Sequence, residues 1–370
     1  MLERKHLESA FTYKSGRPPE NLLKEKNIKK IYPLASNENY LGPSKKAIEA
    51  INEFSKDIHL YPDTLCNSLR EKLSQKFEIP IENILVGAGS SEIISMLYTA
   101  FVELDERILV PNPSFMLYKV LAKFMNLNLD IYNLNDDFTY NIDEIIKKNA
   151  LKTKIIVVVS PNNPTGTIIT KNQLEKLSKN LRDDQILCLD EAYIEFNDSA
   201  DHYGNLIPLL NDKRFEDKNI ILVRTFSKIY ALAGMRVGYA FAKKQIIDSL
   251  LKVLKPFTVS SLTEQAAIAS LEDEQFVEKT VNLVKDARKY VYHELDKMNI
   301  DYIKGFGNFV FIKTKDVEKI TNNLLNKGIV VRPTKQFGYE QAIRITYGDL
   351  EANQAFIEAL KENIEYLCLK

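Results

Sequence analysis

The chain of 370 residues lacks tryptophan and contains only three cysteines and four histidines. The cysteines, Cys66, Cys188 and Cys368, are far apart and show no CxxC spacing, so the sequence indicates neither a disulfide framework nor a zinc site. The histidines are scattered, and surface or packing positions explain them better than catalysis does. An enzyme with this sequence would therefore not depend on histidine for its acid–base chemistry.

The sequence also lacks net charge and long apolar segments. Fifty Lys and Arg residues balance 50 Asp and Glu residues, which removes the basic surface that nonspecific nucleic-acid binding requires. The N-terminus has no apolar signal sequence, and no uninterrupted apolar run reaches the length of about 18 residues that marks a membrane-spanning helix. We therefore expect a cytoplasmic protein that binds neither nucleic acid nor a membrane.

The composition, 45% hydrophobic and 27% charged, is that of an ordinary globular protein, and the length allows a large α/β body with a smaller one. Between about residues 80 and 240, short apolar runs alternate with amphipathic stretches, which is typical of a parallel sheet with crossover helices. The expected strands are 82–87, 107–111, 127–134, 154–160, 185–193, 219–227 and 235–242. Residues 262–299 contain neither Gly nor Pro, which predicts one long connecting helix. A strand, a helix, two strands and a helix are expected after it.

The stretch VRTFSKIYALAGMRVGY (223–239) holds the most informative group of side chains. Lys228 follows a buried strand, Thr225 and Ser227 precede it, and Arg236 comes eight residues later. An unprotonated lysine amine forms a Schiff base with an aldehyde, while hydroxyl groups and a guanidinium bind a phosphate. The stretch therefore suits an aldehyde cofactor that carries a phosphate, although a lysine taken alone is more often a solvated surface charge.

Other strand ends carry polar groups that fit such a cofactor, and open α/β sheets bind ligands beyond the carboxyl ends of their strands. Asp190 ends an apolar strand, where an unpaired carboxylate costs on the order of several kcal/mol, so a protonated pyridine nitrogen would suit it; a helix N-cap is the alternative. Tyr193 could donate to a ring oxygen. Asn163 lies at another strand end, or simply forms a turn. The turn VGAGSSE (86–92) offers backbone N–H groups to a phosphate.

The same turn also resembles a degenerate dinucleotide-binding loop, which would indicate a nicotinamide-dependent enzyme. Glu92 occupies the position of the third glycine, and no acidic residue suited to a ribose ends a strand about 20 residues downstream. This hypothesis is therefore the weaker one. A non-catalytic regulator on the same fold is weaker too, because the lysine, the acid and the arginine are all present and no length is left for a DNA-binding segment.

Eight motifs follow one another along nearly the whole chain: LASNEN (34–39), LYPD (60–63), GAGSSE (87–92), PNNPTG (161–166), DEAY (190–193), TFSK (225–228), LAGMRVGY (232–239) and IRITYG (343–348). Together they resemble the pyridoxal-phosphate aminotransferases, most closely the histidinol-phosphate aminotransferase family. The resemblance implies a homodimer with an aspartate-aminotransferase-like large domain, in which helices flank a mostly parallel seven-stranded sheet, and a smaller α/β C-terminal domain. The expected division is an N-terminal arm at 1–30 that joins the small domain, a large pyridoxal-phosphate-binding domain at 31–260 and a small domain at 261–370.

The resemblance also implies roles for single residues around pyridoxal 5'-phosphate. Lys228 resembles the lysine that forms the Schiff base and moves the substrate proton, and Asp190 resembles the partner of the pyridine nitrogen. Tyr193 and Asn163 resemble the ligands of the ring oxygen, and Phe115 the aromatic residue that stacks on the ring. The implied phosphate cup consists of Ser90, Ser91, Thr225, Ser227 and Arg236, joined by Tyr61 from the neighbouring subunit.

On the substrate side, Arg344 resembles an arginine that binds a carboxylate, which suits glutamate. Tyr13 and Arg332 are at positions expected to contact a substrate phosphate, and Asn39 is also expected at the substrate. No metal is expected. The departures from the family pattern surround the substrate and leave its identity open: Tyr40 and Leu41 after Asn39, Ser91, Phe115, and Asp349 after Gly348.

The leading hypothesis is an aminotransferase that moves an amino group between glutamate and a small phosphorylated substrate, either histidinol phosphate or a smaller phosphorylated amine or carbonyl compound. The alternative on the same fold is a decarboxylase of a phospho-amino acid such as O-phosphoserine or O-phosphothreonine. Both remain open at this point, because the same cofactor machinery serves both reactions.

Overall fold

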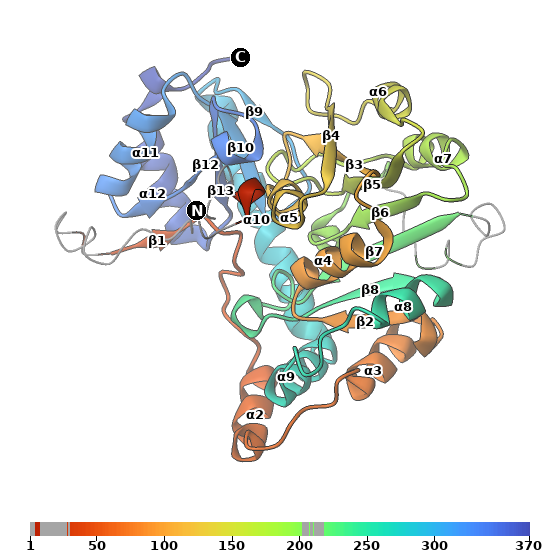
Figure 1. The fold of residues 1–370 in the computed structure, drawn as a ribbon. Coiled ribbons are helices and arrows are strands. Elements are labelled where there is room, and N and C mark those ends of the chain that lie inside the picture. Colours follow the sequence, from red (N-terminus) through yellow and green to blue (C-terminus); the bar gives the residue numbers. More distant parts are fainter. Residues whose placement is uncertain (1–3, 8–27, 29, 202–206, 208–209, 211–217) are drawn as a thin grey trace.

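The computed structural model of the protein describes residues 4–7, 28, 30–201, 207, 210 and 218–370. Seven strands within these residues form one sheet: β2 (Ile84–Gly87), β3 (Arg107–Asn112), β4 (Asn128–Asn133), β5 (Thr153–Val159), β6 (Ile186–Asp190), β7 (Asn219–Thr225) and β8 (Gly238–Ala242). Their order is β2-β8-β7-β6-β5-β3-β4 (Figure 1), and all neighbours run parallel except β8, which is antiparallel to β2 and to β7. The expected mostly parallel sheet of seven strands is confirmed.

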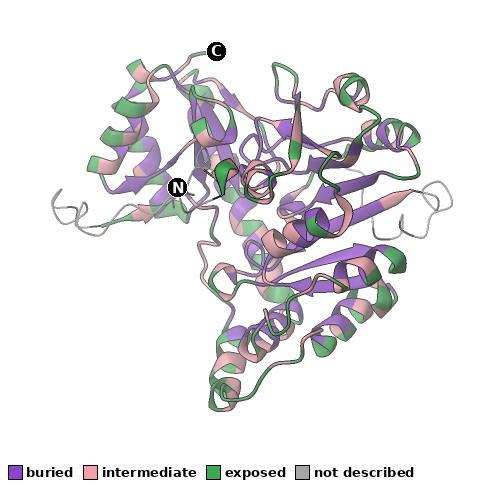
Figure 2. Ribbon diagram, viewed as in Figure 1, coloured by how far each residue is buried: buried purple, intermediate pink, exposed green. Residues whose placement is uncertain are grey.

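Helices cover both faces of this sheet, whose central strands are buried (Figure 2) and carry apolar side chains on both sides. Residues 155, 157 and 159 of β5 belong to one core, and residues 156 and 158 belong to the other. The first core also contains α4 (Ser90–Phe101), α5 (Leu117–Met125) and α8 (Lys244–Leu251). The second also contains α3 (Asn67–Phe77), α6 (Ile142–Lys148) and α7 (Lys171–Lys179).

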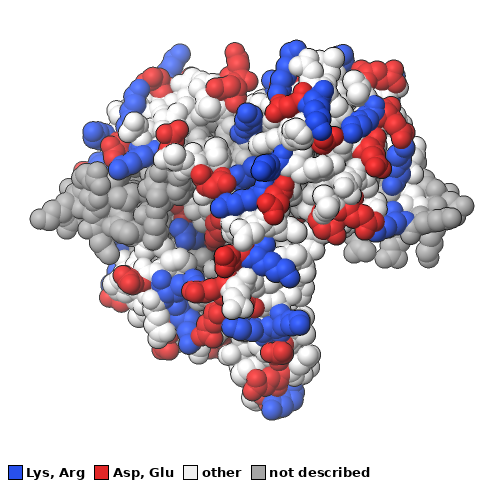
Figure 3. All heavy atoms as spheres, turned by 180° about the vertical axis from the view of Figure 1, so that it is seen from behind, with Lys and Arg blue, Asp and Glu red and all other residues white. Residues whose placement is uncertain are grey.

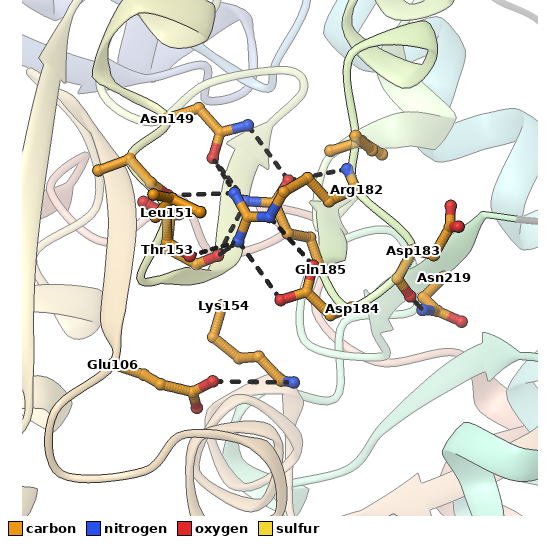
Figure 4. Close-up of polar contacts among 12 residues, drawn as sticks. Glu106, Asn149, Leu151, Thr153, Lys154, Arg182, Asp183, Asp184, Gln185 and Asn219 are labelled. Carbon is orange, nitrogen blue, oxygen red and sulfur yellow. Dashed lines mark hydrogen bonds and ion pairs between the residues drawn. The ribbon is translucent and has the colours of Figure 1, made fainter.

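At the amino ends of the central strands, the side chain of one arginine donates hydrogen bonds to several backbone oxygens (Figure 4). Arg182, just before β6, donates to the carbonyl oxygens of Ala150, Leu151 and Thr153 at distances from 2.8 to 3.1 Å, and it also binds Asp184. The polar groups in this network are thus used to hold the loops before β5 and β6. The polar side chains that line a cavity lie instead at the carboxyl ends of the strands.

The connection after the large sheet differs from the expected single helix. It consists of α9 (Ser261–Leu271) and α10 (Glu274–Lys297), so the prediction of one helix over 262–299 was wrong. The side chain of Asp273 accepts a hydrogen bond from the N–H of Phe276 and caps a new helix. Absence of Gly and Pro permits a continuous helix but does not require one.

The C-terminal part contains an antiparallel sheet of four strands in the order β12-β13-β10-β9, with two helices beside it (Figure 1). These elements are β9 (Tyr302–Ile303), β10 (Phe309–Lys313), α11 (Val317–Asn326), β12 (Arg332–Pro333), β13 (Ala342–Thr346) and α12 (Leu350–Lys361). The first of the two strands expected before the last helix, IVVRPT (329–334), is divided between two sheets, because β11 (Ile329–Val330) pairs with β1 (Tyr32–Pro33) instead of with β13. The N-terminal segment thereby joins the C-terminal part.

The remaining described elements are α2 (Lys45–Phe54) and the short 3-10 helices η1 (Lys5–Leu7), η2 (Ser55–Asp57), η3 (Ile81–Asn83), η4 (Ile194–Phe196), η6 (Ala233–Met235), η7 (Lys335–Phe337) and η8 (Ile364–Tyr366). Helix α9 packs against α2 and α3, so contacts cross the expected boundary at 260/261. The pairing of β1 with β11 joins residues expected in the large domain to residues expected in the small one, so it also crosses the boundary at 260/261. The division of the chain at these residues stays a prediction.

Within the described part of the chain, no helix is both long enough and apolar enough to cross a membrane. On the face shown in Figure 3, acidic and basic side chains are interspersed, in keeping with the equal numbers of the two charges in the sequence. On this face, neither sign of charge dominates.

Candidate active site

A cavity of about 500 Å³ lies at the carboxyl ends of β5, β6 and β7 and reaches the C-terminal sheet. Twelve of the residues expected at a site line it together: Ser90, Ser91, Phe115, Asn163, Asp190, Tyr193, Thr225, Ser227, Lys228, Arg236, Arg332 and Arg344. They come from distant parts of the sequence and are brought together because parallel strands end at the same edge of a sheet.

Lys228 lies in the turn after β7, and its Nζ donates a hydrogen bond to the backbone oxygen of Ser36 at 3.0 Å. Nζ also lies 5.6 Å from the centre of the Tyr193 ring. Burial, together with the positive charges of Arg344 and Arg236, lowers the pKa of Lys228 to about 7. A large share of the amine is therefore uncharged near neutral pH, as a nucleophilic lysine requires.

Asp190 ends β6 with only 3% of its surface exposed. Its Oδ1 accepts a hydrogen bond from the N–H of Ala192 at 3.0 Å, and its Oδ2 accepts one from the hydroxyl of Tyr118. Burial raises the pKa of Asp190, and no described Lys, Arg or His forms an ion pair with it. A buried carboxylate with this environment suits a cationic ligand atom such as a protonated pyridine nitrogen.

Tyr193 and Asn163 lie at the centre of a buried hydrogen-bond network. The Tyr193 hydroxyl accepts from Nδ2 of Asn37 at 3.0 Å and from Nδ2 of Asn163 at 3.4 Å. Oδ1 of Asn163 accepts from Nη1 of Arg344, whose Nη2 donates to the backbone oxygen of Ala35. Asn163 thus connects the phenol of Tyr193 to the guanidinium group of the C-terminal sheet.

The first turn of α4 forms the opposite end of the cavity. No described side chain caps this helix, so its first N–H groups are available to an anion. Nη2 of Arg236 lies 3.5 Å from Oγ of Ser91, and Oγ1 of Thr225 lies 3.0 Å from Oγ of Ser227. These groups are the donors that a phosphate accepts from.

Gly238, the first residue of β8, allows the sheet to approach α4 closely. A Cβ atom at this position would lie 2.5 Å from the nitrogen of Ser90 and 2.9 Å from the carbonyl oxygen of Arg224. Both contacts are with backbone, which cannot move aside easily. The absence of a side chain at Gly238 therefore sets the shape of the phosphate end.

Aromatic rings and two arginines form the remaining wall. The Phe115 ring lies 6.4 Å from that of Phe337 and 6.4 Å from that of Tyr118. Arg332 and Arg344 are directly opposite each other on β12 and β13, and their guanidinium carbons lie 5.6 and 5.3 Å from the Phe337 ring centre. Two cationic groups thus face the cavity across a shared aromatic ring.

Two of the expected site residues that the structure describes, Tyr61 and Asn39, do not line this cavity. Tyr61 is 84% exposed, and its ring stacks on that of Phe257 at 4.7 Å. Asn39 instead donates to the backbone oxygens of Lys228 and Ile229 at 3.3 and 3.1 Å, so it holds the turn that carries the lysine. Tyr13 lies outside the described residues, and its substrate contact stays a prediction.

Sequence reasoning missed three residues of the site. Tyr118 and Asn37 contact Asp190 and Tyr193, and Phe337 lines the cavity. Tyr118 follows Phe115 at helical spacing, which is a signal that could have placed it beside the strand ends. Asn37 has a positive φ of 55°, and Phe337 precedes a glycine, but neither pattern indicates a ligand.

Comparison with known proteins places this cavity in a family. The family model described as aminotransferase class I and II matches residues 29–360. The chain belongs to this family. It is 38% identical over 351 residues to a histidinol-phosphate aminotransferase of Caldicellulosiruptor saccharolyticus, covering 95% of this chain and 96% of the relative. The expectation of an aminotransferase that depends on pyridoxal 5'-phosphate is confirmed.

Solved structures confirm the aspartate-aminotransferase-like fold of this family member. The histidinol-phosphate aminotransferase from Sinorhizobium meliloti, in complex with pyridoxal-5'-phosphate, has a TM-score of 0.85 and 22% identity, with 98% of each chain covered. A single mutant of Thermus thermophilus aspartate aminotransferase has a TM-score of 0.83 and 19% identity, covering 98% of this chain and 99% of that one. At these identities the likeness shows the fold.

Proposed function

We propose that this aminotransferase moves an amino group between glutamate and a small phosphorylated substrate of the histidinol-phosphate type. The observation that carries the proposal is the pair of arginines, Arg344 and Arg332, which line the same cavity as Lys228. One guanidinium fork suits the carboxylate of glutamate, and a second suits a phosphate on the other substrate. The curated relative described above, a histidinol-phosphate aminotransferase, supports this substrate class.

The residues of the cavity fit the cofactor from three sides. Asp190 would hold the pyridine nitrogen, and Tyr193 and Asn163 would hold the ring oxygen. The phosphate would lie at the first turn of α4, with donors from Thr225, Ser227 and Arg236 and from the N–H groups of Ser90 and Ser91. Phe115 would lie beside the ring.

Bound pyridoxal 5'-phosphate supplies an aldehyde that takes up the amino group and a ring that withdraws electrons from the substrate Cα. Lys228 is the only described lysine that lines the cavity, and with a pKa of about 7 it exchanges a proton near neutral pH. It can therefore take the proton from the substrate Cα and return it. Arg344 would orient glutamate, so that its Cα faces the lysine amine.

We also propose that the protein is a homodimer. Tyr61 has a largely exposed ring beside Phe257, which is 45% exposed, and neither residue lines the cavity of its own subunit. A contact between Tyr61 and the cofactor phosphate would thus require a second copy of the chain. Part of the apolar surface around these rings would be buried by that copy.

The cytoplasm is the proposed location. Cys66 and Cys188 are buried free thiols, and Cys368 is a free, partly exposed one. A reducing compartment keeps such cysteines free.

We also propose that the chain is divided into an arm at 1–30, a large domain at 31–260 and a small domain at 261–370.

The proposal can be tested with single half-reactions of the cofactor-bound protein. Glutamate, histidinol phosphate, serinol phosphate, phosphoserine and phosphothreonine would be added separately, and loss of the visible absorbance would report amino transfer to the cofactor. Glutamate and at least one phosphorylated amine should react. Reaction with glutamate and none of the phosphorylated amines would refute the substrate class, while carbon dioxide release without use of a keto acid would indicate the decarboxylase.

A variant separates this chemistry from simple cofactor binding. Lys228→Ala should lose both the absorbance of the lysine-bound cofactor and all half-reactions, since the only amine among the described cavity residues is removed. Lys56→Ala, a change at an exposed lysine outside the cavity, is the matched control. An undiminished absorbance in Lys228→Ala would contradict the assignment of the lysine.

A further inference from the structure

Tyr118 lies behind the carboxylate of Asp190. It is the second residue of α5, it is only 1% exposed, and it does not line the cavity. Its hydroxyl donates a hydrogen bond to Oδ2 of Asp190, which is on the neighbouring β6. The contact therefore reaches Asp190 from the protein interior, on the side away from a ligand.

The other ionisable groups near Asp190 do not favour its charged form. Glu191, next in the chain, is another acid, and the nearby Cys188 and Tyr140 are held as neutral groups because burial raises the pKa of each. Burial also raises the pKa of Asp190 itself. The two described contacts that oppose this effect are the Tyr118 hydrogen bond and the N–H of Ala192, which donates to Oδ1 at 3.0 Å.

The direction of the Tyr118 hydrogen bond is set by its own environment. Burial, followed by the negative charge of Asp190, raises the pKa of Tyr118 well above its usual value, so the phenol keeps its proton. A phenol that keeps its proton donates it, and a carboxylate accepts more strongly than a carboxylic acid does. With Oδ2 engaged by Tyr118 and one lone pair of Oδ1 engaged by Ala192, the orientation of the carboxylate is determined.

Tyr118 also contacts the residue expected on the face of the cofactor ring. Its ring meets that of Phe115 edge-on, at 6.4 Å and 88°. Phe115 precedes α5 and Tyr118 is in its first turn, so one short segment holds the residue expected at the ring face and also contacts Asp190, the residue expected at the ring nitrogen. Core packing accounts for the ring contact with Phe115, whereas the hydrogen bond to Asp190 depends on the hydroxyl.

We propose that Tyr118 is a positioning residue whose hydroxyl holds Asp190 in the ionised form and in the orientation that a protonated pyridine nitrogen requires. This inference rests on the proposed role of Asp190 as the partner of that nitrogen. It deepens that role by naming what keeps a buried acid charged, since a protonated Asp190 would not stabilise the ring cation.

The test compares Tyr118→Phe with Tyr132→Phe in the cofactor-bound protein. Tyr132 is also fully buried, and its hydroxyl donates to the backbone oxygen of Val157 at 2.8 Å, so its loss removes a buried hydrogen bond that does not involve Asp190. With cofactor labelled at the ring nitrogen, the ¹⁵N chemical shift reports protonation. We expect Tyr118→Phe to move this signal toward the unprotonated value and to weaken cofactor binding about tenfold. Tyr132→Phe should change neither.

The rate with glutamate supplies a second readout. In Tyr118→Phe the maximal rate should fall about tenfold while the concentration of glutamate for half-maximal rate stays within about twofold, because Arg344 is untouched. Tyr118→His restores a donor on a shorter side chain and should recover part of both the rate and the ¹⁵N signal. It also serves as the test variant should Tyr118→Phe fail to fold, with a signal between the unprotonated and the wild-type values expected.

Several results would overturn the inference or its foundation separately. A wild-type ¹⁵N signal in Tyr118→Phe would overturn the role of Tyr118, as would a fully unprotonated signal in Tyr118→His. A ring nitrogen that is unprotonated in the wild-type protein, or unaffected by Asp190→Asn, would instead refute the role of Asp190. A wild-type protein that binds no cofactor would refute the proposed function.

Discussion

Replacing Lys228 by Met should stabilise the cofactor-free protein at neutral pH. The charged lysine is disfavoured in the folded state, because burial and the charges of Arg344 and Arg236 lower its pKa from 10.5 to about 7. In the unfolded chain the amine has its ordinary pKa, so the unfolded state binds more protons than the folded state between these two pH values. Stability of the wild-type protein should therefore rise with pH across this window.

The magnitude follows from the same values. A pKa difference of one between the unfolded and folded states corresponds to about 1.4 kcal/mol of stability. The decrease of the Lys228 pKa from 10.5 to about 7 therefore destabilises the folded protein by at most roughly 5 kcal/mol. Two effects reduce it: the amine faces a cavity that admits water, and Met loses the hydrogen bond to Ser36, worth about 1 kcal/mol. We expect Lys228→Met to be more stable than wild type by about 2 kcal/mol at pH 7.

Urea unfolding of the cofactor-free proteins, followed by circular dichroism between about pH 7 and pH 10, measures this difference. The gain of Lys228→Met should be largest at pH 7 and below, and it should shrink as the pH approaches 10.5. Lys56→Met changes an exposed lysine and should show no such trend. A gain for Lys228→Met that is independent of pH, or a loss at pH 7, would refute the reasoning.

Three further outcomes are expected. Gly238→Ala should weaken cofactor binding at least tenfold in equilibrium dialysis, because its Cβ would lie 2.5 Å from the nitrogen of Ser90. Gly234→Ala, where the new Cβ would have nothing within 4 Å, should leave cofactor binding unchanged. Equal loss of binding in the two variants would contradict the role given to Gly238. Arg344→Lys should raise the glutamate concentration for half-maximal rate by about 10- to 100-fold without loss of the cofactor absorbance, since a bidentate contact is lost; an unchanged value would remove the arginine from glutamate binding. Tyr61→Phe should weaken cofactor binding several-fold while sedimentation still shows a dimer, and wild-type affinity would count against a contact between subunits.

The large sheet could be predicted from the sequence because its strands are buried on both faces. A run such as KIIVVVS (154–160) is apolar throughout and ends in a polar residue, and such runs leave few alternatives to a parallel strand. The ends of those runs then indicate the residues of the cavity. Asp190 and Lys228 were found in this way, before the resemblance to a family was considered.

The order of the strands and the break between α9 and α10 could not be predicted in the same way. Strand β8 lies between β2 and β7, which are far apart in the sequence, and only tertiary pairing determines that order. Asp273 is one of several acidic residues in a helical pattern, and nothing local indicates that it is the one that caps a helix. The pattern of apolar residues alone therefore indicated a longer helix than the one that forms.

The side chains that contact the cavity residues from behind could not be predicted from the sequence either. Tyr118 contacts Asp190 across a gap of 72 residues in the sequence, and Asn37 contacts Tyr193 across 156. An isolated tyrosine on a helix or asparagine in a turn has many possible partners. Such contacts depend on how two elements pack, and short-range patterns do not contain that information.

Because Arg332 and Arg344 lie opposite each other, the stability of the folded protein should depend on bound anions. Like charges directly opposite on neighbouring strands destabilise a sheet, and Lys228 and Arg236 add positive charge to the same cavity. An anion that binds only the folded state raises its stability by about 2.7 kcal/mol at 100 times the dissociation constant. The small C-terminal sheet should therefore be more stable while anionic substrates are bound than in the empty protein. Depletion of substrate would then lower the thermal stability of the protein.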